Sequence, residues 1–347
     1  MRFLLLVMIL AMLLALPVSA RELTAPTVPE SGAEIMPKNT ESFGNALWEM
    51  VRNALKALRP DVREVSGLCL SLTGIVLLIS LVQALMGSVG KTADLVGVVA
   101  IGVLLLQQTN TLVHLGVETV EELSSYGKLL LPVMTAAMAA QGGVTSSTAL
   151  YTGTALFDSV LVSLISRLMT PMVYLFIALS AANSAVGEDV LKKFRDFIKW
   201  LMTWCLKIIL YVFTGYMGIT RVICGTTDAA ALKAAKLTIS GVVPVVGNIL
   251  SDASEAVLVS AGLVKNAAGI YGLLAVLAMC IGPFLRIGSH YLMLKATGAV
   301  CSVFGSKRVT GFIGDFSVAM GLLLAMTGSV CVLLLISTVC FLNGVSA

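Results

Sequence analysis

The run VSGLCLSLTGIVLLISLVQALMGSVG, Val65–Gly90, contains no charged residue. About 20 apolar residues in a helix cross a bilayer core, so this run is long enough to span a membrane. Three more uncharged runs have spanning length: Leu95–Val113, Asn266–Leu285 and Phe316–Ala347. The whole chain of 347 residues is 58% hydrophobic and only 12% charged, about half the charged share of soluble domains. The sequence therefore predicts an all-α polytopic membrane protein with about six spanning helices.

The first twenty residues are typical of a signal peptide. Arg2 is followed by a short apolar core and by Val18-Ser19-Ala20, a small-residue cleavage pattern. Cleavage after Ala20 is the prediction, and an uncleaved first helix is the alternative. In both cases the chain from Arg21 onward begins outside the cytoplasm.

Residues 21–64 form an extracytoplasmic lead that ends in an amphipathic segment. Apolar residues recur at helical spacing from Phe43 to Leu58, and charged residues such as Arg52 and Lys56 take the other face. We expect an amphipathic helix that either lies on the membrane or docks a partner. Residues 65–128 then hold two spanning helices and an acidic outer segment.

Two proline pairs indicate a tandem repeat. Pro132 and Pro244 are separated by 112 positions, and so are Pro171 and Pro283. We therefore divide the membrane region into repeat 1, residues 129–225, and repeat 2, residues 226–347, with chance similarity as the alternative.

Each repeat contains a basic segment, which bears on the orientation of the repeats. If both basic segments face the cytoplasm, the repeats run parallel. The first element of each would then be a re-entrant broken helix, and we place its breaks at Pro132, Gly142, Gly143 and Pro244. Inverted repeats that span fully are the alternative.

The basic segment of repeat 1 predicts a cytoplasmic interfacial helix. Four cations lie around an apolar face: Lys192, Lys193, Arg195 and Lys199. Such a helix is attracted to anionic membrane lipid.

A polar group inside an apolar stretch is the candidate functional site. Asp252 and Glu255 lie three residues apart, so on a helix they share a face, and Asn248 precedes them. Charges at bilayer depth are costly and therefore usually functional. Three interpretations stay open: Asp252 caps a helix, the acids line a hydrated pore or substrate site, or they contact another subunit.

The sequence offers no support for catalysis. It has no phosphate-binding loop, no zinc-protease motif and no nucleophile elbow. The seven cysteines form no C-x-x-C pair, and two isolated histidines are too few for a metal site. We expect no enzyme activity, no cofactor, no metal and no nucleic-acid partner.

The run VPVVGNILSDASEAVLVSAGLVKNAAGIYG, Val243–Gly272, resembles the most characteristic stretch of the stage III sporulation protein AE family. The layout of signal sequence, hydrophilic lead and several spans is also similar to that family. The resemblance implies a role in the mother-cell membrane around the forespore, within a channel or secretion-like complex that sustains late forespore gene expression. Its implied partners are the other stage III sporulation A-operon proteins and, across the intermembrane space, stage II sporulation protein Q.

Three functions remain open at this point. The protein is a membrane subunit that contributes to the conduit of such a complex, a stand-alone carrier of a small solute, or an assembly platform that conducts nothing. The midplane acids favour the first two, and the outer amphipathic helix favours assembly.

Overall fold

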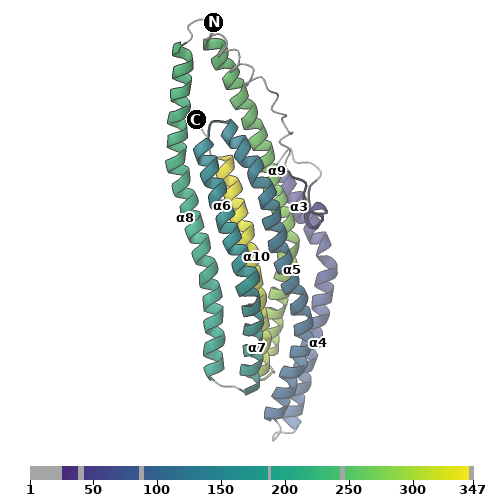
Figure 1. The fold of residues 1–347 in the computed structure, drawn as a ribbon. Helices are drawn as coiled ribbons and strands as arrows, with labels where there is room; N and C mark the ends of the chain where they lie inside the picture. The colour runs from purple at the N-terminus through teal and green to yellow at the C-terminus, as the bar shows by residue number, and fades with distance from the viewer. Residues whose placement is uncertain (1–25, 38–42, 86–89, 187–188, 243–246, 344–347) are drawn as a thin grey trace.

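The structure is a computed structural model that describes residues 26–37, 43–85, 90–186, 189–242 and 247–343 (Figure 1). Of the helical residues 235–261 it places the backbone only. Its helices are α2 (Glu30–Ala33), α3 (Phe43–Ala57), α4 (Arg59–Leu85), α5 (Gly90–Ala140), α6 (Val144–Leu164), the π-helix η2 (Ile165–Met169), α7 (Thr170–Val186), α8 (Asp189–Val242), α9 (Gly247–Cys301) and α10 (Lys307–Leu342). No strand occurs in these ranges.

Six helical stretches of the described chain are long and apolar enough to cross a membrane. They are Arg59–Leu85, Thr92–Ala140, Val144–Val186, Val190–Ala231, Lys265–Cys301 and Lys307–Leu342. The prediction of an all-α polytopic protein with about six spans is confirmed.

The long helices alternate in direction along one bundle (Figure 1). The chain reverses at the lower end of the view between α4 and α5, between α7 and α8, and between α9 and α10. Both basic segments therefore lie at this end, and Arg195 of α8 forms an ion pair of 2.5 Å with Asp315 of α10. The same-side placement expected for parallel repeats is present. The boundaries at 64/65, 128/129 and 225/226 fall inside α4, α5 and α8, and the repeat itself stays a prediction.

The predicted break at Pro132 is wrong, because α5 continues through this proline to Ala140. Leu130 and Met134 are buried beside Gly272 and Gly269 of α9, and this packing offsets the backbone hydrogen bond that proline removes. The chain reverses at residues 141–143, which include the predicted breaks at Gly142 and Gly143, and Gly142 adopts a positive φ of 92° that favours glycine. Residues 129–157 are thus the tip of a hairpin between two long helices, and not a broken helix. Pro244 lies outside the described residues.

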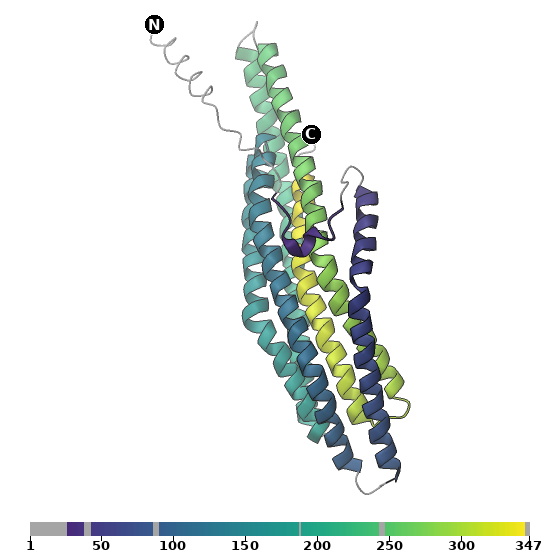
Figure 2. The same ribbon diagram turned by 90° about the vertical axis from the view of Figure 1, so that its right-hand side faces the viewer.

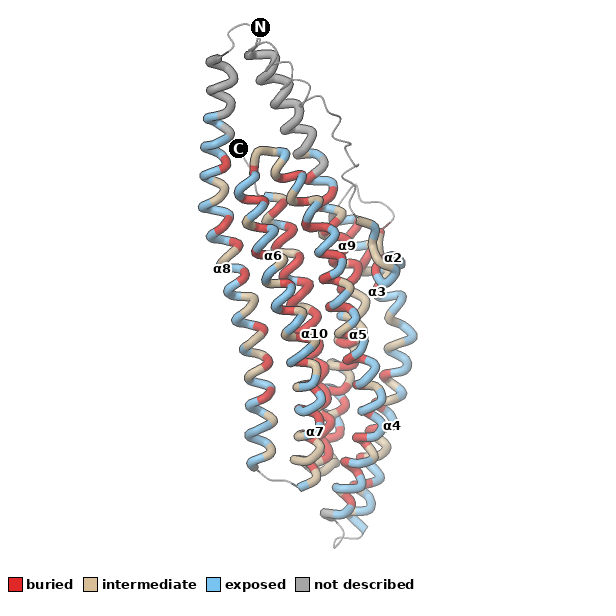
Figure 3. Tube along the Cα trace, viewed as in Figure 1, coloured by how far each residue is buried: buried red, intermediate tan, exposed pale blue. Residues whose placement is uncertain are grey.

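The core runs along the bundle axis. α10 lies among α5, α6, α7, α8 and α9, and most of its residues are buried along its whole length (Figure 3). Phe312, Phe316 and Phe341 are among its fully buried side chains. An apolar helix surrounded by other helices is typical of a polytopic bundle.

The helices are much longer than a bilayer core is thick. α5, α8 and α9 have 51, 54 and 55 residues, which at about 1.5 Å per residue gives lengths of about 77–83 Å. The apolar run of α4 from Val65 to Leu85 is about 31 Å long and matches one bilayer core of about 30 Å. With the hydrocarbon at that run, the bundle extends far beyond it on the side of the N-terminal lead.

Candidate functional site

The predicted acidic site lies near the start of α9. This helix begins at Gly247, so Asn248 is in its first turn and Asp252 and Glu255 follow inside the helix. Asp252 is therefore not a helix cap, and that interpretation is wrong. The side chains of all three residues lie outside the described part, so the pore and the subunit contact stay predictions.

The predicted interfacial basic helix is not a separate element, because its residues form the first turns of the long helix α8. Lys192, Lys193 and Lys199 are exposed, whereas Arg195 turns inward to Asp315. A row of half-exposed aromatic rings accompanies them: Phe194, Phe197, Trp200 and Trp204, with centroids 5.9–6.4 Å apart. Tryptophan and lysine at one helix end are typical of a membrane–water interface, and the attraction to anionic lipid stays a prediction.

Five polar side chains meet between α4, α5 and α9, and we call them the α4–α5–α9 cluster: Asp61, Glu64, Gln108, Arg286 and His290. Asp61 Oδ1 lies 3.4 Å from Arg286 Nε. Gln108 Nε2 donates to Glu64 Oε1 at 3.5 Å and lies 3.0 Å from His290 Nε2. A polar path therefore leads from exposed Glu64 to His290, which is only 1% exposed.

The hydrogen bonds of His290 determine its protonation state. An amide nitrogen can only donate, so His290 Nε2 accepts the bond from Gln108. The other ring nitrogen, Nδ1, then carries the proton and donates to the carbonyl of Arg286 at 2.9 Å. The ring is neutral in this arrangement, and a second proton would require the Gln108 amide to turn over.

Asp61 and Glu64 directly precede the apolar run that begins at Val65. With the bilayer core at that run, the α4–α5–α9 cluster lies at its outer boundary. Ionised groups are tolerated there far better than at the bilayer centre.

Further polar contacts join helices in the outer part of the bundle. Ser124 of α5 donates to Asp158 of α6 at 2.5 Å. Thr154 of α6 and Ser337 of α10 are 2.6 Å apart, and all four residues are buried. Buried polar groups that find partners on neighbouring helices hold those helices in one register.

Asp228 of α8 caps α6 from outside that helix. Its carboxylate oxygens accept from the backbone N–H groups of Thr145 at 3.1 Å and Ser146 at 2.8 Å. The first N–H groups of a helix have no partner within it, and a negative charge there is favoured by the helix dipole. Asp228 thus holds the hairpin tip at residues 141–143 against α8.

The profile of the stage III sporulation protein AE family matches residues 34–344. The chain belongs to this family. It is 21% identical over 222 residues to stage III sporulation protein AE of Bacillus subtilis (strain 168), which covers 64% of the chain. The matched region spans 56% of that relative's length. No solved structure matches the chain.

Membership makes this chain a multi-pass membrane protein of a sporulation family. Within its described residues, no group of three or more histidine, cysteine or acidic side chains could hold a metal ion. The polar groups that the fold brings together pair with one another between helices. They are suited to fixing the arrangement of the helices.

Sequence reasoning missed the α4–α5–α9 cluster, although a signal was present. Asp61 and Glu64 are three residues apart, and Arg286 and His290 are four apart, so each pair shares a helix face. Nothing in the sequence shows that these two faces meet, because 225 positions separate Asp61 from Arg286.

Proposed function

We propose that the protein is a membrane subunit of an intercellular channel complex in the mother-cell membrane around the forespore, and that late forespore gene expression depends on it. Its proposed partners are other stage III sporulation A-operon proteins and, across the intermembrane space, stage II sporulation protein Q. It contributes to or supports the conduit and has no catalytic role.

The extension of the bundle beyond one bilayer thickness carries this proposal. The two basic segments, at the start of α8 and the start of α10, lie at the lower end, which the positive-inside tendency assigns to the cytoplasm. The opposite end, toward which the hairpin tip at residues 141–143 points, then projects into the space between the two membranes. The surface of the bundle in the intermembrane space would then be accessible to partner proteins that connect the two membranes.

The stand-alone carrier is the second candidate, and the α4–α5–α9 cluster favours it. A buried neutral histidine linked through an amide to an exposed carboxylate is suited to proton-coupled movement of a solute. The non-conducting assembly platform is the third candidate, and the polar contacts that hold neighbouring helices together favour it.

One set of variants separates these functions in sporulating cells of an endospore-forming host whose own copy is replaced by this chain. The test variant is Asp252→Asn/Glu255→Gln. The control is Glu118→Gln/Glu121→Gln, which removes the same charge from exposed positions of α5. The measurements are co-purification of the complex and a forespore-specific late promoter fused to a reporter.

We expect the test variant to assemble normally and to lose reporter expression, while the control retains both. Loss of assembly in the test variant alone would contradict conduction and support the platform. Solute uptake by the purified chain in vesicles would contradict the role of channel subunit and support the stand-alone carrier.

A further inference from the structure

α3 is held on the bundle by one of its faces. Ala46, Met50 and Ala54 are 0–2% exposed and pack with Leu274 and Ala278 of α9. These three residues follow helical spacing, so they fix which way the helix is turned. Its opposite face consequently points away from the described bundle.

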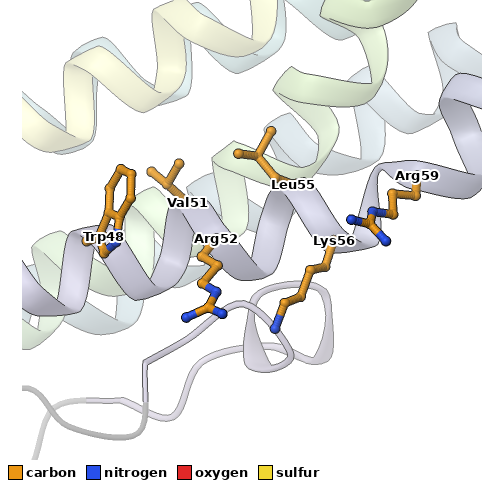
Figure 4. Close-up of a pocket in the computed structure, with 6 residues that line it drawn as sticks. All are labelled: Trp48, Val51, Arg52, Leu55, Lys56 and Arg59. Carbon is orange, nitrogen blue, oxygen red and sulfur yellow. The ribbon is translucent and has the colours of Figure 1, made fainter.

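That opposite face carries two parallel rows of side chains, shown in Figure 4. One row is apolar and the other cationic, and together they line a shallow groove that we call the α3 outer face: Trp48, Val51, Leu55, and Arg52, Lys56, Arg59. The Trp48 side chain is 72% exposed and Leu55 is 53% exposed. A large exposed tryptophan beside arginine is the composition of a binding hot spot.

The cationic row is not paired with an acidic side chain of the described chain, although Glu49 lies one turn before Arg52 on the same side of α3. Arg52, Lys56 and Arg59 make no ion pair or side-chain hydrogen bond with any described residue. The spacing of each row along the helix would match a second helix laid alongside, with apolar residues on one side and acids on the other.

The height of the face above the bilayer argues against lipid as its occupant. Backbone bonds from Leu58 N to Ala54 O and from Val62 N to Leu58 O continue from α3 into α4, and the two helices follow one another in Figure 2. At about 1.5 Å per residue, Trp48 stands about 25 Å and Arg52 about 20 Å above Val65. The headgroup layer adds only about 5–7 Å on each side of the core. Most of the face therefore stands clear of the membrane.

A second copy of the chain is a poorer match than a different protein. The exposed acidic stripe of α5 offers Glu118 and Glu121, but Leu129 is the one apolar side chain among its other exposed members from Thr111 to Leu129, and the rest are polar: Thr111, His114, Ser125 and Lys128. This stripe supplies negative charge without an apolar row for Trp48 to contact.

We propose that the α3 outer face binds an acidic amphipathic helix of a partner protein in the intermembrane space. The apolar row of the partner covers Trp48, Val51 and Leu55, and its carboxylates pair with the three cations. This proposal rests on the membrane-subunit function proposed above and adds the kind of partner that the subunit binds. A binding measurement tests it without a sporulation phenotype. Failure of one proposal is thus distinguishable from failure of the other.

The full chain is reconstituted in nanodiscs of neutral phosphatidylcholine with Trp200→Phe/Trp204→Phe, which leaves Trp48 as its one tryptophan. The probe is a designed helical peptide with leucine at heptad spacing and a flanking row of glutamate. A matched peptide carries lysine in place of each glutamate. Trp48 emission reports binding, since the ring loses water contact when it is covered.

The acidic peptide should shift Trp48 emission to shorter wavelength and bind more weakly as salt rises. Arg52→Glu/Lys56→Glu should weaken this binding about tenfold and favour the lysine peptide. The control Lys192→Glu/Lys193→Glu makes the same charge change at the far end of the bundle and should bind as the parent does.

Equal binding of the two peptides, or no binding, would overturn the proposal. An emission shift without peptide, when anionic lipid replaces the neutral lipid, would assign the face to the membrane. The same shift in discs that hold two copies, and not in discs that hold one, would assign it to self-association.

Discussion

Replacing Asp228 with alanine tests whether a single carboxylate holds the hairpin tip. Asp228 is 5% exposed and accepts two backbone N–H groups of α6, at 3.1 and 2.8 Å. Losing two charge-assisted bonds and a favourable dipole contact costs about 2–4 kcal/mol of unfolding free energy. With an unfolding entropy of about 2.1 cal/mol/K per residue over the chain, Tm should fall by about 3–6 °C.

The assay is thermal unfolding of the purified protein in one detergent, followed by far-ultraviolet circular dichroism. Glu121→Ala on the exposed face of α5 is the control and should shift Tm by less than about 1 °C. Asp228→Asn keeps one acceptor oxygen without the charge and should recover about half of the loss. A Tm for Asp228→Ala within 1 °C of the control would refute the capping role.

Two further predictions concern contacts between helices. In Gly153→Ala the added methyl would overlap the ring of Tyr216 on α8 and lower the free energy of unfolding by about 1–3 kcal/mol. Gly215→Ala is the control, because its methyl would enter open space and should add up to about 1 kcal/mol of helix propensity. A Tm that changes in the same direction in both variants would contradict the close approach of α6 and α8 at Gly153. Arg195→Ala removes the ion-pair partner of the mostly buried Asp315 carboxylate and should cost about 2–4 kcal/mol. The double variant Arg195→Ala/Asp315→Ala should be more stable than Arg195→Ala alone. Additive losses in this double-mutant cycle would show that the ion pair contributes nothing.

The polar contacts between helices explain how helices longer than a bilayer core stay packed together outside it. A helix of 54 residues that crossed a bilayer without partners would bury no apolar surface beyond the hydrocarbon. Here the contacts at Asp228, Asp158 and Arg195 occur at different heights along the bundle and tie α8, α6 and α10 to their neighbours. The part outside the bilayer is therefore held together by these contacts as one packed unit.

The sequence by itself determined the class of fold and the number of long helices. Uncharged runs such as Val65–Gly90 can lie in lipid only as helices, because each backbone polar group must find its partner within the segment. The two basic segments were also recognisable from the sequence, and their composition predicted that both lie at the same end of the bundle. The family, too, was recognisable from the residues between Val243 and Gly272.

Only the tertiary structure decided where the helices end and which polar groups meet. Pro132 and Gly142 both predict a break in the sequence, but packing against α9 lets the helix continue through Pro132 to Ala140. The reversal occurs at Gly142, whose lack of a side chain permits the positive φ. Asp228 and the first turn of α6 are more than 80 positions apart, and so is every pair that joins α4 to α9. Local periodicity places a side chain on a helix face, but it contains no information about which other face the bundle brings against it.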